Sequence, residues 1–363
     1  MFDYAFLRQT RLILTFIAPS TREPVGGVAA LYEFANALVR RKHRVNVIHV
    51  SLTDELVMGL DELAWFEFED GLQHFFLGSI TELPRADFVF GFSESFPPEG
   101  GLPVVFVQGV NILRPELDDE TFGQPCPQVC IARWLVEFGR RRGVPSDQLV
   151  YVPYGIKHEK YRMLRAIEDR PPQVAMCYSA HHTKGAAYAI EALEHAKEQV
   201  PELTGVFFGT WDLEHRLPDW ITYLLNPAQD VIVGDVYNGS RLFLSASVIE
   251  GFGMPSIEAM ACGCALVTTD NGGSEDFAIH AETALVSPPR DVDALAGNVV
   301  RLLTDDVQRV RLAEAGNEYV RRFDWDESAA VLEGFLHRYR ADPERYRKPV
   351  QRQDPSASDR SLA

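Results

Sequence analysis

Short runs of consecutive apolar residues alternate along this chain with longer segments in which apolar and polar residues recur at helical spacing. The first run, residues 11–19, is apolar apart from Arg11 and Thr15 and predicts a buried strand. A turn at Gly26 and Gly27 and an apolar-periodic helix reaching about Arg41 are expected to follow it. Further strands of this half are predicted at residues 44–50, 87–91, 103–107 and 149–152. This rhythm is typical of an open, largely parallel α/β sheet.

The pattern breaks between residues 154 and 172, where the chain becomes polar and charged, and then begins again. Strands of the second half are predicted at residues 174–180, 205–210, 241–247 and 265–270. Amphipathic helices are predicted at residues 292–304, 306–321 and 327–340. We therefore predict a first domain at 1–160, a second at 161–335, a helix end at 336–347 and a disordered tail at 348–363.

The composition agrees with two packed domains. A chain of 363 residues exceeds the roughly 250 to 300 residues at which single cores stop growing. With 46% hydrophobic and 24% charged residues, it has the make-up of a globular protein. The formal net charge of -17 argues against a nucleic-acid partner, because such binding needs a clustered basic surface.

The cysteines and the apolar runs bear on the compartment. The five cysteines are odd in number and follow no recognisable leader, so we expect a reducing cytoplasm and no zinc site. No apolar run approaches the ~20 residues that span a bilayer. The basic runs at residues 40–44 and 140–142 leave peripheral contact with an anionic inner membrane face open, although cations also suit a helix end.

The segment richest in candidate chemistry is SVIEGFGMPSIEAMACG at residues 247–263. A strand is expected to end at Glu250, and Pro255 is expected to open a helix that carries Glu258. Gly251 and Gly253 would let backbone N–H groups approach a ligand, and a helix N-terminus favours an anion such as a diphosphate. The two glutamates could then accept hydrogen bonds from the hydroxyls of one sugar ligand.

This segment closely resembles the retaining glycosyltransferases of family 4, which have the GT-B fold and a Glu-x7-Glu signature matched by Glu250 and Glu258. The likeness covers nearly the whole chain, since Gly26-Gly27 matches the phosphate-facing loop of the N-terminal half. Residues 152–156 match the strand entering the hinge, and residues 259–273 match the segment after the signature. The resemblance implies two Rossmann-like domains facing each other across a cleft, with the acceptor bound by the first and the donor by the second.

The resemblance also implies roles for residues. Glu250 would hold the donor sugar, Glu258 the nucleotide ribose, and Lys184 would neutralise the diphosphate, which makes Glu250 and Lys184 the candidate catalytic pair. The backbone from Gly251 through Phe252 and Gly253 to Met254 would contact the sugar and phosphates. The implied reaction transfers a hexose or deoxyhexose from a nucleotide-diphosphate sugar to an acceptor hydroxyl, with no metal and no further cofactor. The acceptor and the oligomeric state stay open.

Two positions depart from the family pattern. Ser179 stands where the family has an arginine, five residues before Lys184. Its role could be taken over by His181, His182 or Arg22. Gln108 stands where many members place a histidine beside the donor sugar. A similar glutamine occurs in relatives that resemble rhamnosyltransferases, which leaves a dTDP-deoxysugar donor open.

Other interpretations compete with this one. The run GFGMPS at residues 251–256 imitates the GxGxxG of dinucleotide-binding domains, with Asp270 near the offset of a ribose-binding acid. Ser256 in place of the third glycine and Pro255 within the turn argue against that NAD-dependent alternative. A third hypothesis is a catalytically silent sugar-nucleotide-binding protein in which Ser179 marks lost activity.

Two acidic pairs resemble metal ligands, Asp291-x-Asp293 and Asp324-x-Asp326. Each pair stands at a predicted helix start, where aspartate is a preferred cap, so we interpret both as caps. Similar structural alternatives exist for the site residues: a tight turn for Gly26-Gly27, a solvated side chain for Lys184, and a helix-start and a strand-end charge for the two glutamates.

Overall fold

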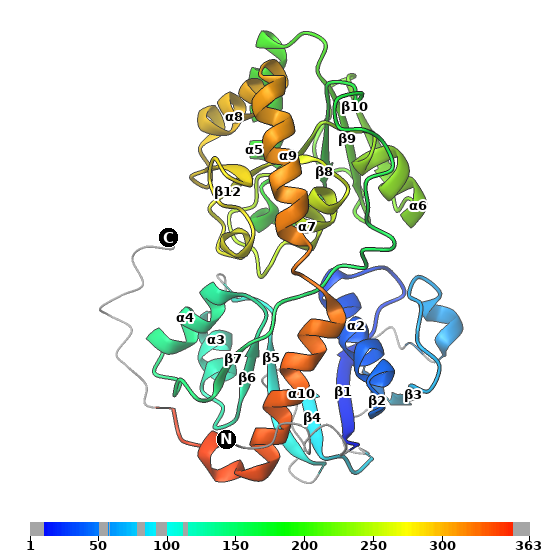
Figure 1. The fold of residues 1–363 in the computed structure, drawn as a ribbon, viewed down its shortest axis with the longest axis vertical. Helices are drawn as coiled ribbons and strands as arrows, with labels where there is room; N and C mark the ends of the chain where they lie inside the picture. Colours follow the sequence, from blue (N-terminus) through cyan, green and yellow to red (C-terminus); the bar gives the residue numbers. More distant parts are fainter. Residues whose placement is uncertain are drawn as a thin grey trace. The chain divides into compact units, whose positions relative to one another are not determined.

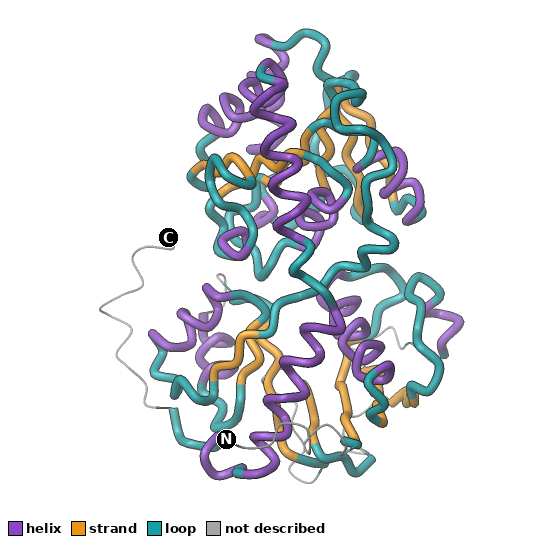
Figure 2. Tube along the Cα trace, viewed as in Figure 1, coloured by secondary structure: helices purple, strands orange, loops and turns teal. Residues whose placement is uncertain are grey.

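The computed structural model describes residues 11–50, 57, 59–77, 84–91, 100–111 and 115–350. The chain divides into two compact units (Figure 1). Unit 1 comprises Met1–Gly155 and Trp325–Ala363, and unit 2 comprises Ile156–Asp324. Each unit contains a parallel sheet, and helical segments connect several of its successive strands (Figure 2). The prediction of two Rossmann-like α/β domains is confirmed.

Unit 1 is built on a sheet whose described strands run in the order β3-β2-β1-β4-β5-β6-β7, with every neighbouring pair parallel. The strands are β1 (Ile13–Pro19), β2 (Arg44–Val50), β3 (Gln73–Leu77), β4 (Phe88–Gly91), β5 (Leu102–Val107), β6 (Gln128–Cys130) and β7 (Leu149–Tyr151). The connecting helices include α2 (Gly26–Arg40), η1 (Leu60–Leu63), α3 (Pro115–Phe122) and α4 (Arg133–Arg141). The strand order reverses between β1 and β4, as in a doubly wound fold.

Unit 2 repeats this design with the order β10-β9-β8-β11-β12-β13, again with every pair parallel. Its strands are β8 (Gln173–Cys177), β9 (Thr204–Gly209), β10 (Ile221–Leu225), β11 (Leu242–Ser245), β12 (Ala265–Thr269) and β13 (Ala284–Ser287). Its helical segments are η2 (His182–Lys184), α5 (Ala186–Gln199), α6 (Gln229–Val231), the π-helix η3 (Ile232–Tyr237), α7 (Met254–Ala261), η4 (Gly273–Asp276), α8 (Val292–Thr304) and α9 (Asp306–Val320). The reversal falls between β8 and β11.

The last long helix, α10 (Trp325–Ala341), belongs to unit 1 together with η5 (Pro343–Tyr346). This corrects the predicted second domain of residues 161–335, because the chain leaves unit 2 after Asp324. The physical reason is aromatic packing: the Trp325 ring lies 5.1 Å from Phe34 and 5.7 Å from Tyr154, and α10 packs against α2. The first crossing falls at residues 155 and 156, near the predicted boundary at 160.

Two further expectations concern chain segments. Gly26 and Gly27 are the first two residues of α2 rather than a turn before it, which corrects the sequence-based assignment. The first N–H groups of a helix have no partner within the helix, so glycines here leave those donors open to a ligand.

The predicted disordered tail lies outside the described residues from position 351 onward.

The basic run at residues 40–44 is engaged inside unit 1. Arg40 binds Glu69 and Asp326, and Arg41 binds Glu333 of α10. Arg40 is also the last residue of α2, where its charge suits the helix dipole. These pairs account for much of the run without an external anion.

The acidic pair at the start of α8 behaves as a cap. The Asp291 carboxylate accepts a hydrogen bond of 3.0 Å from the Ala294 N–H. Among the described residues, no group of three or more His, Cys, Asp or Glu side chains is arranged to hold a metal ion. In the same part of the chain, no helix combines the length and apolar character that crossing a membrane requires.

Candidate functional site

The candidate site of unit 2 lies at the switch point of its sheet. Strands β8 and β11 are neighbours, and the segments that follow them carry the predicted residues Ser179, Lys184 and Glu250. In doubly wound sheets, ligands bind outside the carboxyl ends of the strands at the place where the order reverses. The topology therefore brings together side chains that are 66 residues apart in the sequence.

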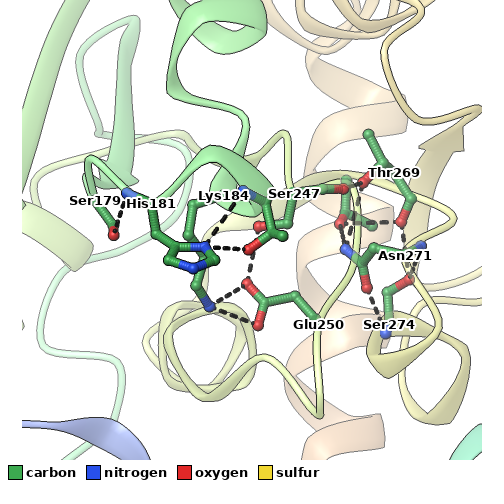
Figure 3. Close-up of polar contacts among 10 residues, drawn as sticks. Ser179, His181, Lys184, Ser247, Glu250, Thr269, Asn271 and Ser274 are labelled. Atoms are coloured by element: carbon green, nitrogen blue, oxygen red, sulfur yellow. Dashed lines mark hydrogen bonds and ion pairs between the residues drawn. The ribbon is translucent and has the colours of Figure 1, made fainter. Parts of the chain in front are cut away.

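Lys184 and Glu250 form a bidentate ion pair at this place (Figure 3). The Lys184 Nζ lies 2.8 Å from each carboxylate oxygen of Glu250. The Ser247 hydroxyl donates a further hydrogen bond of 2.8 Å to Glu250 Oε1. The Glu250 carboxylate thus accepts hydrogen bonds from both Lys184 and Ser247, which fixes the lysine ammonium next to it.

The close approach of the two loops depends on a glycine. Gly185 has a φ of +66°, and a Cβ at this position would lie 2.0 Å from the Ala246 carbonyl oxygen. The Val248 N–H donates to the Thr183 carbonyl at 2.7 Å, which joins the same loops through their backbones. Only glycine fits this contact, so the local sequence after Lys184 is what lets the ammonium reach Glu250.

The electrostatics keep the lysine charged. Burial acts to lower the pKa of Lys184, but the charge and hydrogen bonds of Glu250 outweigh it, and the pKa is raised above its ordinary value. The Lys184 side chain is 39% exposed and that of Glu250 only 14%. The pair therefore offers a fixed cation that ligands can reach, next to a carboxylate that is largely desolvated.

Glu250 itself does not end a strand, which corrects the sequence-based assignment. Strand β11 ends at Ser245, and Glu250 lies in the loop beyond it. Its N–H donates to the Asn271 carbonyl at 2.9 Å, and it forms an isolated parallel bridge with Gly272. The loop after β12 thus fixes the Glu250 backbone, while the Asn271 side chain accepts from the Ser274 N–H at 2.9 Å within that loop.

The glycine-rich segment after Glu250 leads into α7. Gly253 has a φ of +102°, which favours glycine, and α7 begins at Met254 with Pro255 in its second position. The Phe252 side chain is buried, and its ring lies 5.8 Å from Phe277 and 5.5 Å from Phe323. These ring contacts hold the loop in place. Gly253 occupies the N-cap position of α7, so no side chain of that residue caps the helix.

Glu258 on α7 has a partner that sequence reasoning missed. The Tyr237 hydroxyl donates a hydrogen bond of 3.1 Å to Glu258 Oε2, and the Tyr237 side chain is buried. Burial, followed by the charge of Glu258, raises the pKa of Tyr237 well above its ordinary value. No local pattern distinguishes this tyrosine from the other apolar residues of its segment, so only the fold could identify it.

Ser179 and the two histidines form a turn after β8. The Ser179 hydroxyl accepts a hydrogen bond of 3.2 Å from the His181 N–H, and His181 Nδ1 lies 2.7 Å from the Thr183 hydroxyl. The rings of His181 and His182 are 4.6 Å apart. Desolvation, followed by the charges of His182 and Lys184, lowers the pKa of His181. His181 and His182 thus lie at the start of η2, the same turn that carries Lys184.

The predicted residues of unit 1 form a separate group. Gln108 follows β5, and its Nε2 donates to the Gly27 carbonyl at 3.0 Å. A Cβ on Gly27 would lie 2.6 Å from Gln108 Oε1, whereas one on Gly26 would meet nothing within 4 Å. Arg22, a suggested substitute for the missing arginine, pairs with Glu62 at 2.6 Å in this unit. Sequence positions far apart thus meet at the start of α2.

Comparisons with known proteins find similarity to glycosyltransferases. The model of the family described as Glycosyl transferases group 1 matches residues 158–319, which lie within unit 2. The D-inositol 3-phosphate glycosyltransferase of Xylanimonas cellulosilytica is 27% identical over 226 residues, covering 61% of this chain and 50% of that protein. The GDP-mannose-dependent alpha-(1-6)-phosphatidylinositol monomannoside mannosyltransferase of Mycobacterium tuberculosis is 37% identical over 218 residues, covering 53% and 56%. The chain spans about half the length of these curated relatives.

The fold is shared with solved structures. The glycosyltransferase of Rickettsia africae ESF-5 superposes with a TM-score of 0.68 at 16% identity, over 92% of this chain and 99% of that one. HepE from Anabaena, solved in complex with UDP-glucose, superposes with a TM-score of 0.72 at 15% identity, over 89% of this chain and 99% of that one. Identity this low carries information on the fold alone. The two Rossmann-like domains are therefore of the GT-B type.

Proposed function

We propose that this chain is a retaining, metal-independent glycosyltransferase that moves a sugar from a nucleotide-diphosphate sugar to an acceptor hydroxyl. The observation that carries the proposal is the Lys184–Glu250 pair at the switch point of unit 2, with Glu258 on the adjacent helix. A fixed cation suits a diphosphate, and carboxylates suit sugar and ribose hydroxyls. The match of residues 158–319 to glycosyltransferases supports the same assignment.

The proposed chemistry breaks the bond between the anomeric carbon and the diphosphate oxygen and forms a bond from that carbon to the acceptor oxygen. Negative charge collects on the departing diphosphate, and the acceptor proton passes to one of its oxygens. Lys184 would stabilise that charge together with the start of α7, whose first N–H is that of Met254. Glu250 would hold the sugar being transferred, because it lies next to Lys184.

The position of the glycine-rich run argues against a dinucleotide-binding alternative. In such domains the glycine fingerprint follows the first strand of the unit. Here GFGMPS follows β11, while the first strand of unit 2 is β8.

A ligand panel followed by an activity assay tests the proposal. Thermal shifts with UDP, GDP, ADP, dTDP and NAD are compared, since a ligand that binds only the folded state raises the midpoint. At least one nucleotide diphosphate is expected to stabilise the protein, and NAD is not. Hydrolysis or transfer of the corresponding nucleotide sugar then separates an enzyme from a silent binding protein. Stabilisation by NAD alone would overturn the proposal.

Glu258→Ala is expected to weaken nucleotide diphosphate binding by about 1 to 3 kcal/mol, the usual cost of losing a charged hydrogen-bond partner. Isothermal titration calorimetry measures the change. Asp293→Ala is the matched control, because this carboxylate lies on α8 and is 92% exposed. Unchanged affinity in Glu258→Ala would refute the ribose assignment.

Transfer activity is expected to survive EDTA. The proposed cation of the site is Lys184, and Asp291, one of the acids that resemble metal ligands, is engaged as a helix cap. Initial rates are compared before and after chelation and dialysis. A loss of rate that added manganese restores would contradict the metal-independent mechanism.

Ser179→Arg is expected to bring no gain in affinity for the nucleotide diphosphate. The new side chain removes the hydroxyl that accepts from the His181 N–H, and its charge is repelled by Lys184, which already acts on His181 in the same turn. Ser179→Ala is the control, because it removes the hydroxyl without adding charge. A clear gain by calorimetry in Ser179→Arg alone would indicate that the natural site grips the diphosphate weakly.

A further inference from the structure

Tyr237 is held on two sides at the end of a rare backbone element. It is the last residue of the π-helix η3 (Ile232–Tyr237), and such segments occur frequently at functional sites. Its hydroxyl donates to Glu258 Oε2 at 3.1 Å, and its carbonyl accepts from the Cys264 thiol at 3.0 Å. The tyrosine ring is fully buried, so its hydroxyl has no alternative partner in solvent.

Arg170 links the tyrosine to the helix that carries Glu258. Its side chain is 1% exposed, and its Nη1 donates to the Tyr237 carbonyl at 3.3 Å. Its Nη2 donates to the Cys262 carbonyl at 2.7 Å, just past the end of α7. The Cys262 N–H in turn donates to the Glu258 carbonyl at 3.0 Å. One buried guanidinium therefore fixes both the donor and the acceptor of the Tyr237–Glu258 hydrogen bond.

We propose that Tyr237 is a positioning residue that orients the Glu258 carboxylate toward the ribose hydroxyls of a nucleotide, and that Arg170 sets the spacing between them. The inference rests on the proposed function, in which Glu258 binds the ribose. A carboxylate has two oxygens and a rotatable side chain, so a fixed donor on Oε2 restricts it to one orientation before the ligand arrives. The ordering entropy is then lost on folding rather than on binding.

If this is so, the preference of the protein for nucleotides with ribose hydroxyls over their deoxy forms depends on the hydroxyl of Tyr237. The affinities of UDP, GDP and ADP are compared by calorimetry with those of their 2′,3′-dideoxy forms, and the affinity of dTDP, which already lacks the 2′-hydroxyl, with that of its 3′-deoxy form. The wild-type protein is expected to prefer the hydroxylated form. In Tyr237→Phe this preference should fall by about three- to tenfold, the range of one hydrogen bond, while affinity for the dideoxy form stays the same.

A double-mutant cycle separates positioning from general loosening. Glu258→Ala is expected to abolish the preference, and adding Tyr237→Phe to it should change nothing further. Tyr339→Phe is the matched control, since it removes another buried tyrosine hydroxyl, one that donates to the Pro103 carbonyl in unit 1. It should leave both affinities unchanged.

The outcomes distinguish a failure of the positioning role of Tyr237 from a failure of the proposed function. Equal loss for both nucleotide forms in Tyr237→Phe, or no loss for either, overturns the positioning role. A wild-type protein that binds none of the nucleotides overturns the proposed function itself. If Tyr237→Phe does not fold, Arg170→Lys replaces it, because lysine keeps the buried charge but cannot span both carbonyls. The same selective fall in ribose preference is expected, and an unchanged preference contradicts the inference.

Discussion

Lys184→Met is expected to lower turnover by about a hundred- to a thousandfold, the range found when a group that stabilises developing negative charge is removed. Methionine keeps an unbranched, flexible side chain of similar length and removes the ammonium. The loss should appear in the rate at saturating donor, because the charge on the leaving diphosphate is largest in the transition state. The loss is measured from initial rates of sugar transfer at a saturating donor concentration.

The resting partner of Lys184 explains why the effect should be large. Its ammonium lies 2.8 Å from both oxygens of Glu250, so a charge is stored at the site and already oriented. Its pKa is raised, and a raised pKa means that the pair stabilises the fold below the ordinary lysine value of 10.5 and loses this contribution only at more alkaline pH. Lys184 should therefore cause no inflection in the pH–rate profile through the neutral range.

Lys197→Met supplies the control for Lys184→Met. Lys197 lies on α5, the helix that follows Lys184, and its ammonium donates to the carbonyls of Pro201 and Leu203 at 2.6 and 2.7 Å. Its replacement should leave the rate unchanged. If Lys184→Met instead kept wild-type turnover and only lowered the melting temperature, the ion pair with Glu250 would be a purely structural contact.

Much of the fold could be predicted from local patterns, and the exceptions have a common cause. Strand β2 and helix α8 have the predicted bounds, because each is one uninterrupted pattern with clear breaks at its ends. The sequence predicts the start of helix α10 in the second domain, whereas the helix belongs to unit 1, since its amphipathic pattern does not say which core it covers. That choice is made by Phe34 and Tyr154, nearly 300 and about 170 residues earlier in the chain, which pack against Trp325.

The features of the site also divide into those that a local sequence pattern predicts and those that depend on the fold. The Glu250 and Glu258 spacing is a local signal and could be read from the sequence. The direct bond between Lys184 and Glu250 could not, because it depends on β8 and β11 being neighbours in the sheet. Tyr237 carries no signal of its own, since a buried tyrosine in an apolar segment is ordinary and its hydroxyl contact with Glu258 appears only in three dimensions.

Glu250→Ala is expected to lower turnover by about a hundredfold without weakening nucleotide diphosphate binding. Its proposed contacts are to the transferred sugar, which a free nucleotide diphosphate lacks, so they matter in the reaction and not in product binding. Turnover is measured with the full donor, and affinity for the nucleotide diphosphate is measured by calorimetry on the same preparation.

The direction in which Glu250→Ala changes the affinity for the nucleotide diphosphate distinguishes a catalytic role of Glu250 from a structural one. In the resting protein, Lys184 is paired with Glu250, and a diphosphate competes with that carboxylate for the ammonium. Removing the carboxylate frees an ammonium on a side chain that is 39% exposed, so diphosphate affinity should hold or rise while turnover falls. Glu250→Gln keeps an acceptor oxygen for a sugar hydroxyl and should retain more turnover than Glu250→Ala. Ser247→Ala, which removes one of the hydrogen bonds that fix Glu250, should give a smaller loss still. Equal losses of turnover and nucleotide affinity in Glu250→Ala would assign Glu250 a structural role, because only a collapsed loop would affect both.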